Sequence, residues 1–179
     1  MLQITIPDYE IFDAKTGKIV TVKGRTIQLE HSLVSVSKWE SKWKKAFISP
    51  TERTREETID YVRCMTITQN VDPIVYQGLT SDLIAKVEAY INDPMTATTF
   101  VKKNRGGGNS IITSEIIYYW MISLEIPVEF QRWHLNRLLT LIRVCEEKSQ
   151  PGKKMSQRDI MRQNRALNAA RKRRSGTRG

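Results

Sequence analysis

The chain has 179 residues, with 29 lysines and arginines against 19 aspartates and glutamates, a formal net charge of +10. Its apolar content of 40% is that of a soluble globular chain. The longest wholly apolar run, Ile116–Ile122, is far shorter than the roughly 20 residues of a membrane span, and residues 1–10 lack the pattern of a signal peptide. Cys64 and Cys145 are too few for a disulfide framework, although one bond between them stays open. We therefore expect a protein of a reducing cytoplasm with no membrane partner.

The positive charge is concentrated at the C-terminal end. Residues 151–179 contain ten lysines and arginines and one acid, Asp159, a net charge of +9, which leaves +1 for residues 1–150. The high isoelectric point is therefore a property of the tail and not of the domain. We expect a single α+β body over 1–150 followed by a basic C-terminal arm over 151–179.

The first 30 residues are predicted to form strands. Leu2, Ile4 and Ile6 alternate with polar residues, residues 13–17 separate two β-rich runs as in a hairpin, and residues 25–30 suggest a third short strand. From His31 the apolar spacing changes to three and four, which indicates a helical remainder over 31–148. The predicted fold class is thus α+β, mostly α: a short N-terminal β-hairpin or meander, a helical bundle and a basic C-terminal helix.

Capping signals divide the helical part. Ser49, with Pro50 and Glu52, predicts the start of a helix, Asp72–Pro73 a short helical turn, and Thr80 or Ser81 the next helix. A glycine-rich segment over 101–110 is predicted to be a loop, because it lacks the lysine pattern of a phosphate-binding loop. Further helices are expected after Thr113 or Ser114, over 128–148, and over about 15 residues from 156 onward. The one at residues 115–126 is apolar on several faces, so we expect it to be buried.

The sequence offers little for catalysis. His31 and His134 belong to no metal or nucleophile motif, and Cys64 and Cys145 lie on apolar helical faces, where cysteine packs as a small hydrophobe. We expect structural histidines, no catalytic or metal-binding residues, no cofactor and no enzymatic activity.

Aromatic and basic residues are better candidates for binding. Trp39, Trp43 and Trp120 have the helical phase of core residues, but Tyr118 and Tyr119 are adjacent on one helix and cannot both point inward. We take Tyr118, Tyr119 and Trp133 as candidate partner-binding residues, since tyrosine and tryptophan are enriched at interfaces. The candidate contacts for a polyanion or an acidic partner are the arm residues Arg158, Arg162, Arg165, Arg171, Lys172, Arg173 and Arg174.

Two segments carry a resemblance to a known family. They are the strand-to-helix segment TIQLEHSLVSVSKWESKW (residues 26–43) and the aromatic helix, turn and leucine-rich helix of SEIIYYWMISLEIPVEFQRWHLNRLLTLIRV (residues 114–144). Together they resemble the tail assembly chaperones of long-tailed bacteriophages, of the actinobacteriophage type. The resemblance implies a non-enzymatic protein of the host cell cytoplasm that binds the tape measure protein and tail tube subunits during tail morphogenesis. In that family a frameshifted longer product is common.

Two alternatives stay open. One is a phage virion structural protein, at the head–tail junction or in the capsid interior, whose basic arm contacts DNA. The other is a nucleic-acid-binding protein, although residues 1–150 contain no recognition-helix, zinc-finger or RNP-like motif. Nonspecific nucleic-acid binding through the arm and self-association into a homo-oligomer are compatible with all three.

Overall fold

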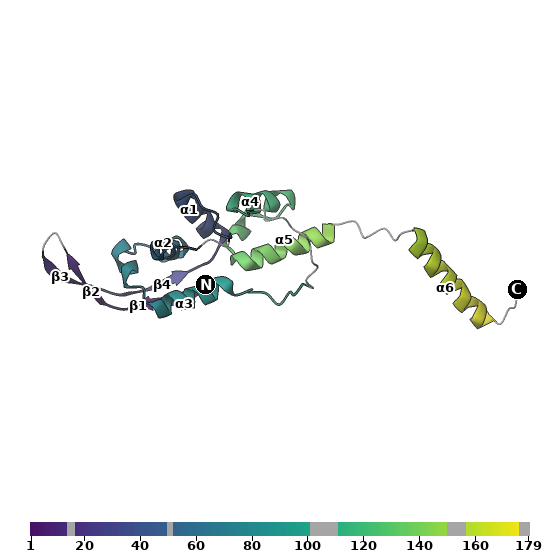
Figure 1. The fold of residues 1–179 in the computed structure, drawn as a ribbon, viewed down its shortest axis with the longest axis horizontal. Coiled ribbons are helices and arrows are strands. Elements are labelled where there is room, and N and C mark those ends of the chain that lie inside the picture. The colour runs from purple at the N-terminus through teal and green to yellow at the C-terminus, as the bar shows by residue number, and fades with distance from the viewer. Residues whose placement is uncertain (14–16, 50–51, 101–110, 150–156, 176–179) are drawn as a thin grey trace. The chain divides into compact units, whose positions relative to one another are not determined.

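A computed structural model describes residues 1–13, 17–49, 52–100, 111–149 and 157–175. The chain divides into two compact units, Met1–Val144 and Cys145–Gly179. The first holds nearly all of the elements, and the second holds the end of the helix over 135–149 and the whole of the basic helix (Figure 1). None of the helices in the described residues is both long enough and apolar enough to cross a membrane.

The fold class is α+β and mostly α, as the sequence predicts. The strands are β1 (Leu2–Ile6), β2 (Tyr9–Asp13), β3 (Lys18–Val22) and β4 (Arg25–Leu29). The helices that follow are α1 (Leu33–Trp43), α2 (Arg55–Met65), η1 (Pro73–Gly78), α3 (Ser81–Asn92), α4 (Ser114–Ser123), η2 (Val128–Arg132), α5 (Leu135–Ser149) and α6 (Gln157–Ser175), where η marks a 3₁₀-helix.

The four strands form one antiparallel ribbon with a break in the middle. β1 pairs with β4 and β2 with β3, and the two ladders share one register: Ile6 opposes Arg25, and Tyr9 opposes Val22. Two residues on each side separate the ladders. In Figure 1 the ribbon can be followed from β1 and β4 to the β2–β3 hairpin.

The break has a local cause. Pro7 has no N–H to donate, and the Asp8 carboxylate accepts a hydrogen bond from the backbone N–H of Gly24 at 2.7 Å. A Cβ at Gly24 would lie 2.1 Å from the Ile6 carbonyl oxygen, so only glycine fits this close approach. Because the ladder is interrupted here, the inward-facing side of the ribbon shifts from the buried Ile4 and Ile6 to the half-buried Tyr9. The Tyr9 hydroxyl donates to the Ile74 carbonyl at 2.5 Å.

The core of the first unit is built from the β1–β4 ladder, from η1 and from the helices α1 to α5, each of which contributes buried apolar residues. Ile27, Leu29, Leu33 and Val36 have no exposed surface, and Trp39 is 1% exposed, with its indole N–H donating to the Glu57 carbonyl at 2.9 Å. Trp39 is therefore a core residue, as predicted. Trp43 and Trp120 are half-buried, and the Trp43 indole donates to the Asp60 carboxylate.

The predicted start of the second helix is wrong. α2 begins at Arg55, and its cap is Thr54: the Thr54 hydroxyl accepts from the Glu57 N–H, and the Glu57 carboxylate accepts from the Thr54 N–H. Ser49 is therefore not its N-cap. The capping pattern occurs twice within nine residues, and the second copy prevails because its glutamate is buried and paired with Lys45.

Two other predictions about helices need correction. The segment 115–126 is not buried as a whole, since Tyr119 is 66% and Ile122 76% exposed. The segment 128–148 is not one helix: η2 precedes α5, which begins only at Leu135. The predicted turn at Asp72–Pro73 is confirmed as η1, and Thr80 caps α3. The predicted loop at 101–110 lies outside the described residues.

Candidate functional site

The N-terminus of α4 is held by a buried carboxylate from α1. Glu40 is 8% exposed, and its two carboxylate oxygens accept from different backbone N–H groups, Oε1 from Phe47 and Oε2 from Ser114, each at 2.8 Å. Thr113, the N-cap by position, makes no side-chain cap hydrogen bond. Since a carboxylate at a helix N-terminus satisfies otherwise unpaired donors and faces the positive end of the helix dipole, Glu40 fixes α4 against α1.

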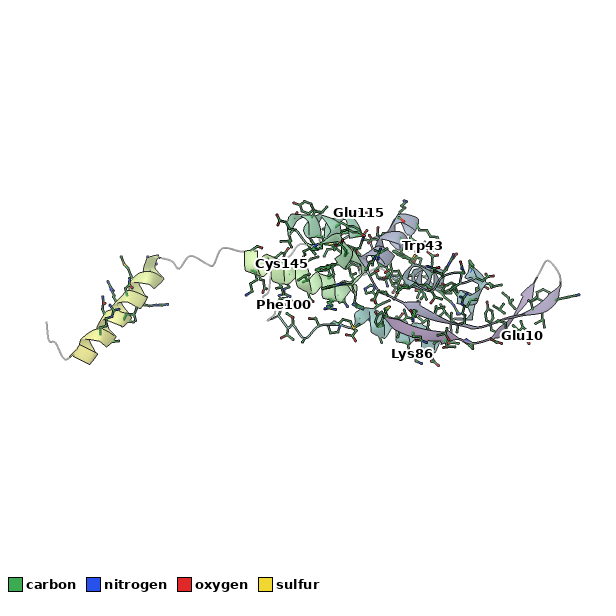
Figure 2. The ribbon with its side chains drawn as sticks, turned by 180° about the vertical axis from the view of Figure 1, so that it is seen from behind. Glu10, Trp43, Lys86, Phe100, Glu115 and Cys145 are labelled. Carbon is green, nitrogen blue, oxygen red and sulfur yellow. The ribbon has the colours of Figure 1, made fainter. Side chains whose placement is uncertain are left out.

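Fixed in this way, α4 presents an exposed face that we call the α4 outer face, made of Glu115, Tyr119 and Ile122. Residues four and three apart share one side of a helix, and all three are exposed. Ile117 and Met121 lie on the opposite side and are buried. Figure 2 labels Glu115 on this helix. Tyr119 and Ile122 therefore expose two large apolar side chains one turn apart on a helix whose other side is core.

Tyr118 and Trp133 lie beside this helix in different settings. The half-buried Tyr118 donates through its hydroxyl to Gln131 Oε1 at 2.9 Å, which ties α4 to η2. Trp133 stacks on Phe130 with ring centroids 4.1 Å apart, and the Arg137 guanidinium lies 4.2 Å from the centre of the Trp133 ring. Tyr118 and Trp133 therefore both contact other residues of the fold, and Tyr119 is the exposed member of the three candidates.

A polar cluster is buried beneath β4, α1 and α2. His31 Nδ1 lies 2.5 Å from the Tyr61 hydroxyl, which is also 3.4 Å from the Ser35 hydroxyl, and all three side chains are 2% exposed. Burial lowers the pKa of His31 to about 3, with the charges of His134 and Arg53 adding to the effect. Burial likewise raises the pKa of the Tyr61 hydroxyl above its ordinary value.

His134 joins this cluster from the start of α5. Its ring lies 5.1 Å from the ring of His31, and its Nε2 lies 3.0 Å from the Tyr90 carbonyl oxygen, to which the neutral ring donates. Burial lowers the pKa of His134 as well, and its Nδ1 is buried without a hydrogen-bond partner. The backbone supports the same junction, since the Leu135 N–H donates to the His31 carbonyl at 2.7 Å.

The two histidines are therefore structural groups that join β4, α1, α2 and α5. Serine, tyrosine and histidine side chains in contact resemble a proton-transfer arrangement, but each of these is buried. A substrate could not reach them without local opening of the fold.

One of the two cysteines, Cys64, lines a cavity. Cys64 and Cys145 are both free thiols, and burial raises the pKa of Cys64, which keeps it protonated and weakly nucleophilic. Cys64 and the cations Lys38, Lys42 and Arg63 line a cavity of about 450 Å³, in which Asp60 pairs with Lys42 and Arg63. A second cavity of about 730 Å³ lies between α2 and η1. Within the described ranges, no three histidine, cysteine, aspartate or glutamate side chains gather closely enough to hold a metal ion.

The basic candidates lie on α6. Four of them are exposed on this helix: Arg158, Arg162, Arg165 and Arg171. The structure does not describe the side chains of Lys172, Arg173 and Arg174. α6 spans 19 residues, somewhat longer than expected.

Sequence reasoning missed several residues. The apolar pattern of residues 115–126 groups Ile122, which lies on the α4 outer face, with the buried residues of its helix, although its position three residues after Tyr119 is a usable signal. Phe12 and Ile19, a cross-strand pair on the β2–β3 hairpin, are 64% and 68% exposed, and the sequence contains no such signal for their exposure.

Comparisons of the chain with protein-family models, curated proteins and solved structures find no match.

Proposed function

We propose that the chain is a non-enzymatic tail assembly chaperone of a long-tailed bacteriophage. It binds the tape measure protein, and also tail tube subunits, during tail morphogenesis in the host cell cytoplasm. The resemblance of residues 26–43 and 114–144 to that family supports this class. The observation that carries a protein-binding role is the α4 outer face, where Tyr119 and Ile122 are exposed on a helix that Glu40 fixes in place.

The chemistry of this face suits an amphipathic helix of the client. Tyrosine and isoleucine one turn apart can pack against an apolar stripe, and the tyrosine hydroxyl can hydrogen-bond at its rim. Residues 1–150 have a net charge of only +1, which favours a protein surface over a polyanion as the partner of the body. Because α4 is held rigidly, little conformational entropy is lost when a client binds.

Co-expression with the tape measure protein of the same phage tests the proposal. The wild-type chain is expected to keep that client in the soluble fraction and to be recovered with it on affinity purification. The double variant Tyr119→Ser, Ile122→Ser is expected to lower client recovery at least tenfold. Removal of two interface side chains of this kind costs about 2 kcal/mol or more of binding free energy. Thermal unfolding of the variant checks that the fold is intact.

The matched control is Phe12→Ser, Ile19→Ser, which removes an equally exposed apolar pair from the β2–β3 hairpin. It is expected to retain the client. Loss of the client in this control but not in the α4 variant would place the binding surface on the hairpin. Absence of any association between the wild-type chain and tail proteins would overturn the chaperone proposal, and stable incorporation into purified particles would favour a virion structural protein.

A further inference from the structure

α6 is a basic helix in which three arginines are aligned. Arg158, Arg162 and Arg165 are spaced by four and three residues, so they share one side of the helix, and each is exposed. Arg171 is also exposed but lies on another side of the helix. We call Arg158, Arg162 and Arg165 the arginine stripe.

The dimensions of the stripe match a phosphate backbone. At a rise of 1.5 Å per residue, the three arginines span about 10 Å of helix axis. Over that length, duplex DNA presents about six phosphates when both strands are counted. The guanidinium group pairs with phosphate through two parallel N–H donors, so arginine suits this contact better than lysine does.

The rest of the segment indicates which polyanion fits. Residues 151–179 contain no phenylalanine, tyrosine or tryptophan, so they lack the stacking platforms with which proteins hold single-stranded nucleic acid. The exposed large apolar side chains described on α6 are Met161 and Leu167, too few for the broad apolar face of a membrane-surface helix. An α-helix fits the major groove of B-form DNA, whereas the major groove of A-form RNA is deep and narrow.

We propose that α6 is a sequence-independent binding element for double-stranded DNA, in which the arginine stripe lies along the phosphate backbone. Contact with DNA favours the helical form, because phosphates bind the arginines best when these are aligned on one side. This inference does not rest on the proposed function. Residues 1–150 and their α4 outer face play no part in it, so either proposal can fail alone.

Fluorescence anisotropy of a labelled 25-base-pair duplex, titrated with the full-length chain at several salt concentrations, tests the proposal. Affinity is expected to fall with salt, with a log–log slope of about −0.9 for each phosphate neutralised. The variant Arg158→Gln, Arg162→Gln, Arg165→Gln is expected to make that slope shallower by about 2.7 and to weaken binding at least tenfold at low salt.

Two control variants test whether DNA affinity depends on the alignment of the arginines on a helix or only on the number of positive charges. Lys153→Gln, Lys154→Gln, Arg178→Gln removes the same charge outside the bounds of α6, and is expected to weaken binding less than the stripe variant. Ala166→Pro keeps every charge but interrupts the helix, because proline removes a backbone donor and clashes with the preceding turn. It is expected to reduce affinity for DNA.

Three results would overturn the inference. One is an equal loss of affinity in the stripe variant and in the charge control, together with no effect of Ala166→Pro. Another is single-stranded DNA of the same sequence, or a double-stranded RNA, binding at least as tightly as the DNA duplex. The third is tighter binding to polyglutamate or to vesicles with phosphatidylserine than to duplex DNA, which would assign the arm to an acidic protein or a membrane surface.

Discussion

At the residue scale, the two buried histidines make the stability of the first unit depend on pH. The pKa of His31 is about 3 in the folded chain and about 6.5 in the unfolded chain. As the pH falls below 6.5, the unfolded chain therefore binds a proton that the folded chain does not. The contribution of His31 to the unfolding free energy is therefore fully present above about pH 7, and it decreases as the pH falls toward 3. His134 acts in the same direction, because burial also lowers its pKa.

The unfolding free energy is therefore expected to be lower at pH 5 than at pH 7.5, by about 2 kcal/mol from His31 alone. Denaturant titrations at the two pH values measure this difference. Glu57 and Asp60 add little to this difference, because their pKa values are lowered and the stability that they contribute is lost mainly as the pH falls below about 4.5. The variant His31→Gln is expected to reduce the difference in unfolding free energy between the two pH values. The variant His134→Gln is expected to keep the part of that difference that His31 contributes. An unchanged pH dependence in His31→Gln would contradict this account.

Single residues also show where sequence reasoning reaches its limit. The burial of Trp39 could be predicted from its helical phase. The role of Glu40, which follows it, could not, because its two partners lie 7 and 74 residues further along the chain. The same limit applies to the α4 outer face. A sequence in which most residues of a helix are apolar does not say which side faces the core, since that depends on where Glu40 anchors the helix.

At the element scale, the β-ribbon depends on the close approach at its break. Gly24→Ala would place a methyl group against the Ile6 carbonyl and the Pro7 backbone, which cannot move without separating the ladders. It is expected to lower the unfolding free energy by about 3 kcal/mol. Gly17→Ala is the matched control, because a Cβ there meets nothing within 4 Å and costs only the positive φ of 67°, about 1 kcal/mol. Denaturant unfolding of both variants measures the two costs, and a Gly24→Ala cost no greater than that of Gly17→Ala would refute this account of the break.

Element types were easier to predict than element boundaries. The strand-rich start and the helical remainder follow from apolar periods of two and of three to four, which are local properties. The sequence pattern misplaces the start of α2, because Ser49 and Thr54 both precede a glutamate at capping distance. The choice between them depends on a tertiary contact, the ion pair of Glu57 with Lys45. The β2–β3 hairpin was predicted, but the exposure of its apolar pair Phe12 and Ile19 follows from the break at Pro7 and Gly24.

At the scale of the whole molecule, charge and core are carried by different parts of the chain. Residues 151–179 carry a net charge of +9, and the buried apolar residues of the described chain end at Ile142 in α5. The side chains that the structure describes in the basic segment therefore add charge without adding core. This arrangement fits the two proposals made above, in which a client protein binds through α4 and duplex DNA binds through α6.

Deletion of residues 151–179 is accordingly expected to leave the rest folded. The truncated chain retains all of α5 through Ser149, including the buried residues Leu135, Leu138 and Ile142. Its melting temperature is expected to lie within about 2 °C of the full-length value, since the lost residues contribute less than about 0.5 kcal/mol. Its retention on heparin is expected to disappear, because the net charge falls from +10 to +1. Calorimetry and heparin chromatography measure the two effects. A truncated chain that unfolds would mean that residues 151–179 are a structural element of the fold, and retention on heparin would place the polyanion contact on residues 1–150.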